Sequence, residues 1–425
     1  MLKTSSFIYK REEWLILNKD GVRELAYVVK IDNIKPIEGS DNCECAVVGG
    51  WNVMTRKGTF QPGDLAIYFE IDSKVDTNKP EFSFLASKHG KIKTQKYTFG
   101  GKGNFVSQGL LMSMKDFPNF ICEAGLGNYK YVKKSDLVCV GDFLTKELGV
   151  TYADAADNKR KSNGVDKYKK MASRHPKLFR NPIIKRIYKT KFGKKLLFVF
   201  FGKSVKKTEL PAWVVKTHAE RCQNLPMLFP GDKTKWIATE KIDGTSTSFT
   251  MKGFGRKRVF KVCSRNVVFD KPDKKCFYDT NVYLEMADKY NIEKVLTDIL
   301  DDNKNILNFI TLQGETYGNG IQKRDYCCSE HCFMAFNLIF GYKDGTTKRF
   351  NPIEMTDMLS EKYGIPCVPI VSEEFYIPET CEELLNIATG ASKIDGGMRE
   401  GLVFRTEDGV RSFKAVSNEF LLAFH

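Results

Sequence analysis

A lysine at the end of a strand-like run is the first residue in this sequence that could act as a nucleophile. Lys241 follows an apolar run that begins at Trp236, and Ile-Asp-Gly separates it from a second strand-like run that begins at Thr245. An Asp-Gly pair between two such runs predicts a tight turn. A lysine fixed by backbone on both sides can be held in the geometry that a reaction needs. This short pattern occurs often by chance, and an exposed hairpin lysine is the other interpretation.

Further polar elements follow Lys241 in a fixed order. Arg265 lies in Ser-Arg-Asn after one strand-like run, and Glu315 lies in Gly-Glu-Thr-Tyr-Gly after another. Phe336 lies within a third run, Glu400 opens Glu-Gly-Leu-Val-Phe-Arg, and Lys414 lies in Ser-Phe-Lys near the end of the sequence. Five elements in one order are far more specific than any one of them.

In this order and spacing the elements resemble the motifs of the covalent nucleotidyltransferase superfamily, which comprises RNA ligases, DNA ligases and mRNA capping enzymes. Residues 216–226 are similar to the segment that precedes the nucleophile in RNA ligases. Residues 63–73 and 107–110 are similar to the N-terminal OB domain of Naegleria-type and Deinococcus-type ATP-dependent RNA ligases. The resemblance covers most of residues 24–150 and 211–425. It implies an enzyme that joins 3′-OH and 5′-phosphate RNA ends, in RNA repair or processing.

The resemblance also implies which residues carry the chemistry. Lys241 is expected to attack the α-phosphorus of ATP and form a lysyl-AMP intermediate. Lys414 is expected to contact the α-phosphate and, as a nearby cation, to depress the pKa of Lys241, because only the neutral amine is a nucleophile. Arg265 is expected to contact the 5′-phosphate strand or the nucleotide phosphates. A phosphorus atom surrounded by anionic oxygens requires such positioning and positive charge.

The same resemblance implies a nucleotide site and a metal site. Glu315 is expected to accept from the ribose hydroxyls and Phe336 to stack on adenine, although Phe336 could instead belong to the core. The further nucleotide-binding candidates are Glu240, Ile242, Gln322 and Arg221. Glu400, with Asp243, is expected to hold Mg²⁺ or Mn²⁺, since hard divalent ions prefer oxygen ligands.

Two features separate this sequence from parts of the superfamily. Many RNA ligases carry Lys-x-Lys in the last motif, whereas here Lys414 stands alone in Phe-Lys-Ala-Val. DNA ligases and capping enzymes usually place an OB domain after this motif, and the short sequence beyond Lys414 has no room for one. We therefore expect an RNA ligase. A DNA or nicked-duplex ligase and a catalytically inactive nucleic-acid-binding protein of the same fold are the alternatives.

The elements that must position these residues predict an α+β protein. The segment 24–150 contains short strands between Gly and Pro turns, which favours an OB-like β-barrel. It is followed by a mixed α+β adenylyltransferase (ATP-grasp-like ligase) domain at 211–425, after a leader at 1–23 and a basic linker at 151–210. We expect barrel strands over 25–31, 45–55 and 64–71. We expect helices over 217–226, 283–301, 353–363 and 379–388.

The positive charge is concentrated in one segment. The chain has 425 residues and a formal net charge of +15, but residues 159–207 alone carry +17 and the remainder −2. Aromatic residues interleave the cations, which suits a phosphate backbone with stacked bases. A solvated linker or helical spacer, an anionic membrane patch and a localisation signal are the other interpretations.

Twelve cysteines in a chain that starts without a signal-like apolar segment predict free thiols in a reducing, intracellular setting. Cys327, Cys328, His331 and Cys332 lie close together, but no clean second ligand pair supports a zinc site. No apolar run approaches the length of a membrane span. We expect a monomer that binds RNA and ATP and no membrane.

Overall fold

The computed structural model describes residues 24–424 with several gaps. The gaps are residues 102, 118–120, 126–127, 134–135, 138, 154–181, 189, 191–196, 198–209, 215–218, 230–232, 270–277 and 279. One compact unit comprises Met1–Thr151 with Glu209–His425, and a second comprises Tyr152–Thr208. Most of the basic segment 159–207 and the whole leader 1–23 lie outside the described residues, so their predicted roles stay predictions. Within the basic segment, α4 (Pro182–Tyr188) is helical.

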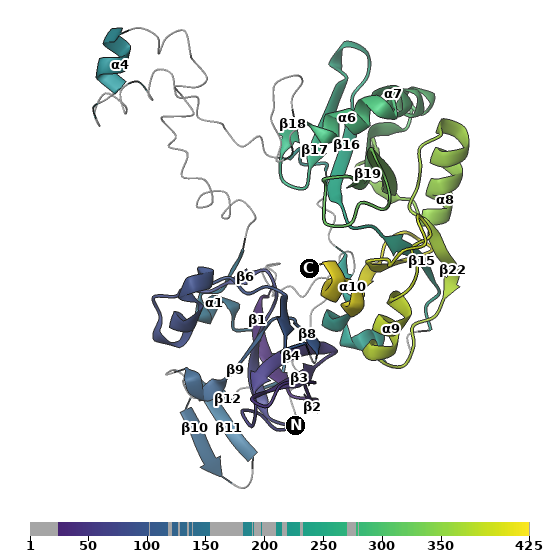
Figure 1. The fold of residues 1–425 in the computed structure, drawn as a ribbon. Coiled ribbons are helices and arrows are strands. Elements are labelled where there is room, and N and C mark those ends of the chain that lie inside the picture. Colours follow the sequence, from purple (N-terminus) through teal and green to yellow (C-terminus); the bar gives the residue numbers. More distant parts are fainter. Residues whose placement is uncertain are drawn as a thin grey trace. The chain divides into compact units, whose positions relative to one another are not determined.

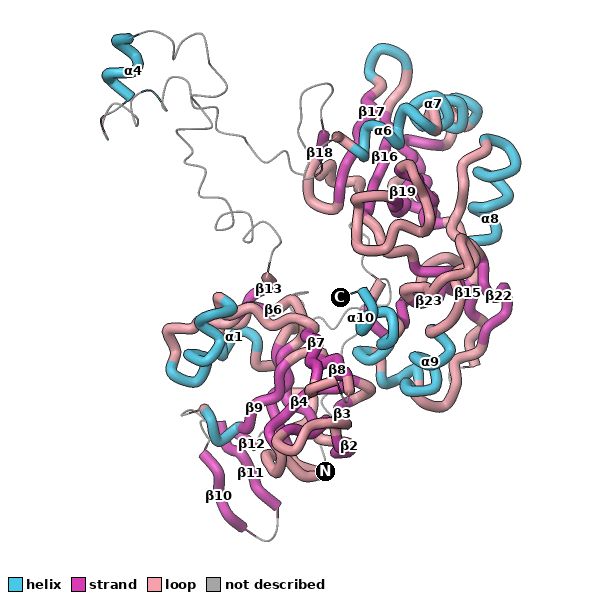
Figure 2. Tube along the Cα trace, in the orientation of Figure 1, coloured by secondary structure: helices cyan, strands magenta, loops and turns pink. Residues whose placement is uncertain are grey.

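The N-terminal part consists of small antiparallel sheets (Figures 1 and 2). The strand orders are β1-β5-β9, β2-β3-β4, β7-β8, β10-β11-β12 and β13-β6. The bounds are β1 (Ala26–Lys30), β2 (Asn33–Pro36), β3 (Cys43–Val48), β4 (Trp51–Arg56), β5 (Leu65–Phe69), β6 (Ser73–Lys74), β7 (Gln95–Thr98), β8 (Asn104–Ser107), β9 (Leu110–Ser113), β10 (Ile121–Gly125), β11 (Asn128–Lys133), β12 (Asp136–Leu137) and β13 (Thr151–Tyr152). Short helical turns are η1 (Pro80–Lys88), η2 (Met114–Asp116) and α1 (Thr145–Leu148).

Strand β5 lies at the centre of this part. Ala66 and Tyr68 belong to one apolar cluster and Ile67 and Phe69 to another. Successive side chains of a strand point to opposite faces, so β5 contributes to a core on each side. The even burial of Leu65–Phe69 thus explains why the strand reads as a continuous apolar run rather than an alternating one.

The prediction of a single strand over 45–55 is wrong. The segment forms the antiparallel hairpin β3–β4, whose turn is Gly49-Gly50 with φ of 53° and 85°. Two consecutive positive φ values are typical of the type I′ turn that joins tight hairpins. The run is apolar on both sides of the turn, so hydrophobicity alone did not reveal the reversal.

The C-terminal part contains two sheets in a mixed α+β arrangement (Figure 1), as predicted. The first has the order β14-β24-β23-β15-β22 and the second β18-β17-β16-β19-β20-β21. The strands are β14 (Glu220–Arg221), β15 (Trp236–Lys241), β16 (Thr245–Lys252), β17 (Val259–Ser264), β18 (Val268–Phe269), β19 (Leu307–Gly318), β20 (His331–Tyr342), β21 (Thr347–Arg349), β22 (Ile370–Phe375), β23 (Gly401–Thr406) and β24 (Ser412–Val416).

Helices cover both sheets. Residues of α6 and α7 pack with β16, β19 and β20 in the largest apolar cluster, and residues of α9 pack on β15, β23 and β24. The helical elements are η4 (Cys222–Asn224), η5 (Pro226–Leu228), η6 (Gly255–Lys257), α6 (Val282–Lys289), α7 (Ile292–Asp302), α8 (Pro352–Thr356), the π-helical turn η7 (Asp357–Glu361), α9 (Cys381–Ala388) and α10 (Asn418–Phe424).

Two helix predictions need correction. The helix expected over 283–301 is broken into α6 and α7 at Asn291, whose φ is 48°. Each of the two helices has its own apolar stripe, so the helical periodicity of the sequence gave no sign of the break between them. The helical piece expected over 217–226 is instead the strand β14 followed by 3₁₀ turns, because Glu220 and Arg221 pair with β24.

Asn291 offers a test of backbone strain. Its side chain caps no helix in this structure, so replacement by Ala or Gly loses no capping bond. The left-handed region costs a residue with a Cβ about 1–2 kcal/mol, whereas glycine adopts it freely. We expect Asn291→Ala to be less stable than Asn291→Gly by about 1 kcal/mol in urea unfolding. Equal stabilities would mean that the break between α6 and α7 imposes no left-handed backbone.

Candidate active site

Lys241 lies where the chain leaves one sheet for the other. It is the last residue of β15 in the first sheet, paired with Gly401, and β16 of the second sheet begins at Thr245. The predicted turn is therefore a crossing between sheets rather than a hairpin. A Cβ on Gly244 would lie 2.4 Å from the Thr316 carbonyl oxygen, so only glycine fits this close approach to β19.

The Lys241 ammonium pairs directly with a carboxylate. Lys241 Nζ donates to Glu400 Oε2 over 2.6 Å, with 23% and 11% of the two side chains exposed. Burial lowers the pKa of Lys241, but the charges of Glu400, Glu315 and Asp243 outweigh burial and raise that pKa above its ordinary value. The expectation that a neighbouring cation depresses it is therefore wrong for the nucleotide-free protein: three carboxylates hold the proton on.

Two carboxylates near Lys241, those of Asp243 and Glu315, bind protons more tightly than ordinary ones. Burial and then the Glu400 charge raise the pKa of Asp243 to about 7. Burial raises the pKa of Glu315 to about 8, with Glu400 and Asp243 adding to the rise, while the cations Lys241 and Arg265 oppose it. Like charges in a partly desolvated site disfavour one another. The site is thus short of positive charge at the point where Lys241 stands.

Two cations, Arg221 and Lys414, lie side by side on neighbouring strands of the first sheet. Strand β14 runs parallel to β24, and Arg221 is in register with Lys414. Burial, then the charges of Arg221 and Lys241, lower the pKa of Lys414 to about 7. The Arg221 Nη1 atom is buried and has no hydrogen-bond partner within the described part of the chain. Lys414 and Arg221 therefore offer charge and donors to an anion.

Phe336 lies on the face of β20 that looks toward Lys241 rather than into the main core. Phe333 and Ala335 are fully buried in the large cluster, whereas Phe336 is half-buried and packs in a smaller cluster with Ile242 and Tyr317. The Arg405 guanidinium of β23 donates to the Phe336 carbonyl over 2.9 Å. The structure thus places Phe336 beside the Lys241 turn, as an adenine-stacking role would require.

The side chains of three other candidates are placed differently. The Glu240 carboxylate points away from Lys241: it accepts from the Ser392 hydroxyl at 2.5 Å and from the Lys393 backbone N–H at 2.7 Å. A nucleotide contact by that side chain is therefore not supported. Gln322 Nε2 donates to the Gly244 carbonyl over 3.0 Å. Arg265 is exposed just beyond β17, and its positive charge opposes the rise in the Glu315 pKa.

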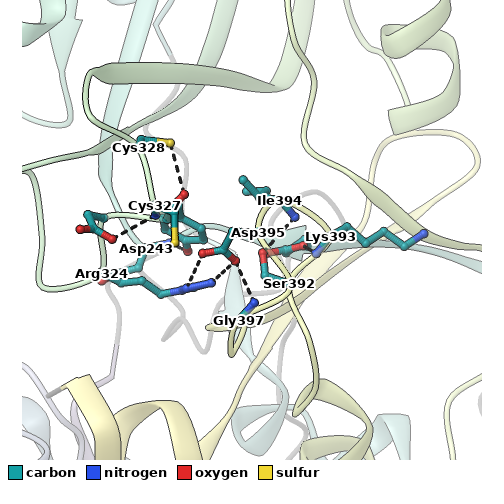
Figure 3. Close-up of polar contacts among 12 residues, drawn as sticks. Asp243, Arg324, Cys327, Cys328, Ser392, Lys393, Ile394, Asp395 and Gly397 are labelled. Atoms are coloured by element: carbon teal, nitrogen blue, oxygen red, sulfur yellow. Dashed lines mark hydrogen bonds and ion pairs between the residues drawn. The ribbon is translucent and has the colours of Figure 1, made fainter.

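Two loops hold the turn that follows Lys241, through residues that the sequence did not single out (Figure 3). The Tyr326 hydroxyl accepts from the Asp243 backbone N–H at 2.7 Å. Arg324, two residues earlier, forms a buried two-pronged ion pair with Asp395, in the loop that leads to Glu400. Such bidentate pairs fix geometry as well as charge. No local pattern marks these residues, because each partner is far away in sequence.

The residues present suit a metal ion that completes its coordination with substrate oxygens. Among the described residues no group of three or more His, Cys, Asp or Glu side chains is placed to hold a metal by itself. Asp243 Oδ2 is nevertheless buried without a hydrogen-bond partner in the described part, near Glu400. Mg²⁺ is typically held by one or two carboxylates together with substrate phosphates and water. The donor set fits that pattern.

Comparison with known proteins agrees with the fold. Residues 234–416 match the family described as RNA ligase, and residues 25–114 match an OB-fold domain family, PHA02142. No curated protein matches the sequence. The matches and the structural likeness define the class: an RNA ligase, and so an enzyme, with an N-terminal OB-fold domain. They confirm the fold class and the resemblance drawn from the sequence.

Solved structures of the Naegleria gruberi RNA ligase are similar to this chain. An apo variant is 25% identical with a TM-score of 0.62, covering 94% of this chain and 98% of that chain. A variant with ATP and Mn is 26% identical with the same TM-score and coverage. A structure with pyrophosphate is 25% identical with a TM-score of 0.59 and the same coverage. The likeness thus spans nearly the whole of both chains.

The Glu240 contacts yield a stability test. Glu240→Ala leaves the buried Ser392 hydroxyl and the partly buried Lys393 N–H without an acceptor, and an unsatisfied buried donor costs about 1–3 kcal/mol. Ser392→Ala is the comparison variant, because it removes the hydroxyl bond to Glu240 but leaves only one donor, the Ile394 backbone N–H, without its acceptor. We expect Glu240→Ala to lower the free energy of unfolding by about 1 kcal/mol more than Ser392→Ala, measured by urea denaturation. Equal losses would contradict a double acceptor role.

Proposed function

We propose that the protein joins 3′-OH and 5′-phosphate RNA ends at the expense of ATP, through a lysyl-AMP intermediate on Lys241, in RNA repair or processing. The observation that carries the proposal is the position of Lys241 at the crossing of two sheets, facing Glu400, Glu315 and Lys414. The match to RNA ligases and the ATP and Mn in the similar Naegleria gruberi structures support it.

In the first step the Lys241 amine forms a bond to the α-phosphorus of ATP while the bond to the pyrophosphate oxygen breaks. Lys241 must first give up its proton, and Glu400, at 2.6 Å, lies in place to receive it. Positive charge brought to the site with ATP would offset the carboxylate charges that raise the Lys241 pKa, and so would favour loss of this proton. Lys414 and Arg221 supply positive charge for the phosphate oxygens, where most of the catalysis of phosphoryl chemistry arises.

Glu400 and Asp243 would hold Mg²⁺ or Mn²⁺, which would supply further positive charge at the phosphates. Both carboxylates already face Lys241, and the Asp243 pKa of about 7 reflects a site that favours added positive charge. Phe336 would stack on the base and Glu315 would accept from the ribose, while Arg265, exposed at the rim, would meet the 5′-phosphate strand.

The remaining two steps use the RNA ends. The AMP passes from Lys241 to the 5′-phosphate, and the 3′-hydroxyl then attacks that phosphate and releases AMP. We propose that the enzyme acts as a monomer in a reducing compartment; the ten described cysteines are free thiols. No described helix has the length and apolar character needed to cross a bilayer.

Label transfer tests the intermediate. We expect ATP labelled at the α-phosphate to leave label on the denatured wild-type chain with Mg²⁺ or Mn²⁺, and Lys241→Ala to reduce it to background. Lys235→Ala is the matched control, since Lys235 is a partly exposed lysine just before the same strand and forms ion pairs with the surface residues Glu374 and Glu407. We expect it to label like the wild type.

Labelling by GTP instead of ATP would contradict the proposal and indicate capping chemistry. An absence of label, persisting after pyrophosphate treatment to remove any bound AMP, would favour the inactive binding protein.

Sealing assays on nicks with RNA or DNA 3′-OH strands then separate an RNA ligase from a DNA ligase, because the 2′-OH beside the nick distinguishes the two. We expect the RNA 3′-OH strand to be sealed faster.

The two lysine pKa values predict a pH signature. The kcat/KM of labelling reports groups of the free enzyme. The pKa of Lys241 is raised, so below that pKa the neutral fraction of Lys241 increases about tenfold for each pH unit. The pKa of Lys414 is about 7, so above pH 7 the cationic fraction of Lys414 decreases about tenfold for each unit. Arginine stays charged. We expect the ratio of Lys414→Arg to wild-type kcat/KM to rise about tenfold per unit above pH 7.

The ratio isolates Lys414, because titration of Asp243 and Glu315 affects both proteins alike. It should be flat below pH 6, where both side chains are cations. A ratio that stays constant from pH 6 to pH 9 would show that Lys414 keeps its proton throughout, against the lowered pKa.

A further inference from the structure

The segment that carries Arg221 is held between the OB-fold domain and the ligase domain. Cys222 and Leu225 are fully buried in the apolar cluster of the first ligase sheet, with Phe413 of β24. Asn224 and Arg221 instead contact Trp51 of strand β4 in the OB-fold domain. All of these residues lie in one compact unit. One short segment therefore connects the OB-fold core to the edge of the active site.

Trp51 is itself fixed on several sides. Its indole Nε1 donates to Asn224 Oδ1 over 3.0 Å, and its ring stacks on Tyr68, with centroids 5.8 Å apart and planes 29° apart. Asn224 Nδ2 in turn donates to Glu70 of the OB-fold domain over 2.9 Å and to Glu220 over 2.8 Å. A buried amide whose oxygen and both N–H groups are bonded in this way is held in one orientation. The Trp51 ring therefore presents a fixed surface to Arg221.

The Arg221 guanidinium rests on that surface. Its Cζ lies 5.7 Å from the centroid of the Trp51 ring, within the range of a cation–π interaction. Its backbone is in register with Lys414, and its charge helps to lower the Lys414 pKa. Its Nη1 is buried and unbonded within the described residues. A buried donor left unpaired is costly unless a ligand takes it, so Arg221 is poised for an anionic oxygen beside Lys414.

The close approach of the two domains at this point is built into the sequence. A Cβ on Gly50, the residue before Trp51, would lie 2.5 Å from Cys381 Sγ at the start of α9. Gly50 also has a φ of 85°, which disfavours any other residue. The hairpin β3–β4 can dock here only with glycine at its turn, and this docking brings Trp51 to Arg221.

We propose that Trp51 is a positioning residue for the nucleotide reaction: it orients Arg221 toward the phosphates that Lys414 and Lys241 meet. The inference rests on the proposed function and extends it.

The test is a double-mutant cycle on lysine labelling by α-labelled ATP without RNA. The variants are Trp51→Ala, Arg221→Ala and the double variant, in the full chain. We expect each single change to lower kcat/KM more than tenfold, and Trp51→Ala to cost less than about twofold in the Arg221→Ala background, since residues acting as a unit are non-additive. Trp51→Tyr keeps an aromatic face for the guanidinium, and we expect it to restore most of the activity.

The matched control is Phe60→Leu, a change in the same OB-fold cluster as Trp51 that touches no part of the Arg221 segment in the contacts described. We expect it to lower the melting temperature yet keep kcat/KM near wild type. The proposal is overturned if Trp51→Ala labels normally, if its effect is the same with and without Arg221, or if Phe60→Leu loses as much activity. A wild-type protein that takes no label refutes the proposed function instead.

Discussion

The pairing of Lys241 with Glu400 sets the terms for the rest of the site. An ammonium and a carboxylate 2.6 Å apart and largely shielded from water stabilise one another, and the cost of removing charges from water requires each to keep its partner. Such a pair holds the amine in its unreactive form. The protein therefore needs other cations nearby, Lys414 and Arg221, and an incoming nucleotide to release it. Resting stability and reactivity are opposed in the same ion pair.

The geometry of two sheets makes this arrangement possible. Lys241 ends a strand of one sheet, Glu315 stands on a strand of the other, and Gly244 allows the chain to pass between them against β19. Loops then fix the crossing, with Tyr326 bonded to the Asp243 amide and Arg324 paired with Asp395. A site assembled from two sheets can gather charges that neighbouring positions of a single strand would send to opposite faces.

The residues proposed to bind the nucleotide were largely predictable from the sequence, and those that hold them in place were not. Lys241, Glu315, Glu400 and Lys414 stand in recognisable local patterns and converge as expected. Arg324 with Asp395 and Trp51 with Asn224 have no such pattern, because their partners lie 71 and 173 residues away. The break at Asn291 escaped the helical periodicity, since a left-handed residue leaves the apolar stripe intact. The lysine pKa values depend on summed charges in space, which sequence order does not give.

The pairing of β14 with β24 has a consequence for synthesis of the chain. Arg221 and Lys414 are adjacent in the sheet although 193 positions separate them, so this pair of cations forms only when nearly all of the sequence has left the ribosome. Non-local strand pairs of this kind form late in folding. A product that stops before Ser412 would carry Lys241 and its turn but only Arg221 of the two cations. Premature release therefore yields a chain in which the proposed nucleotide site is incomplete.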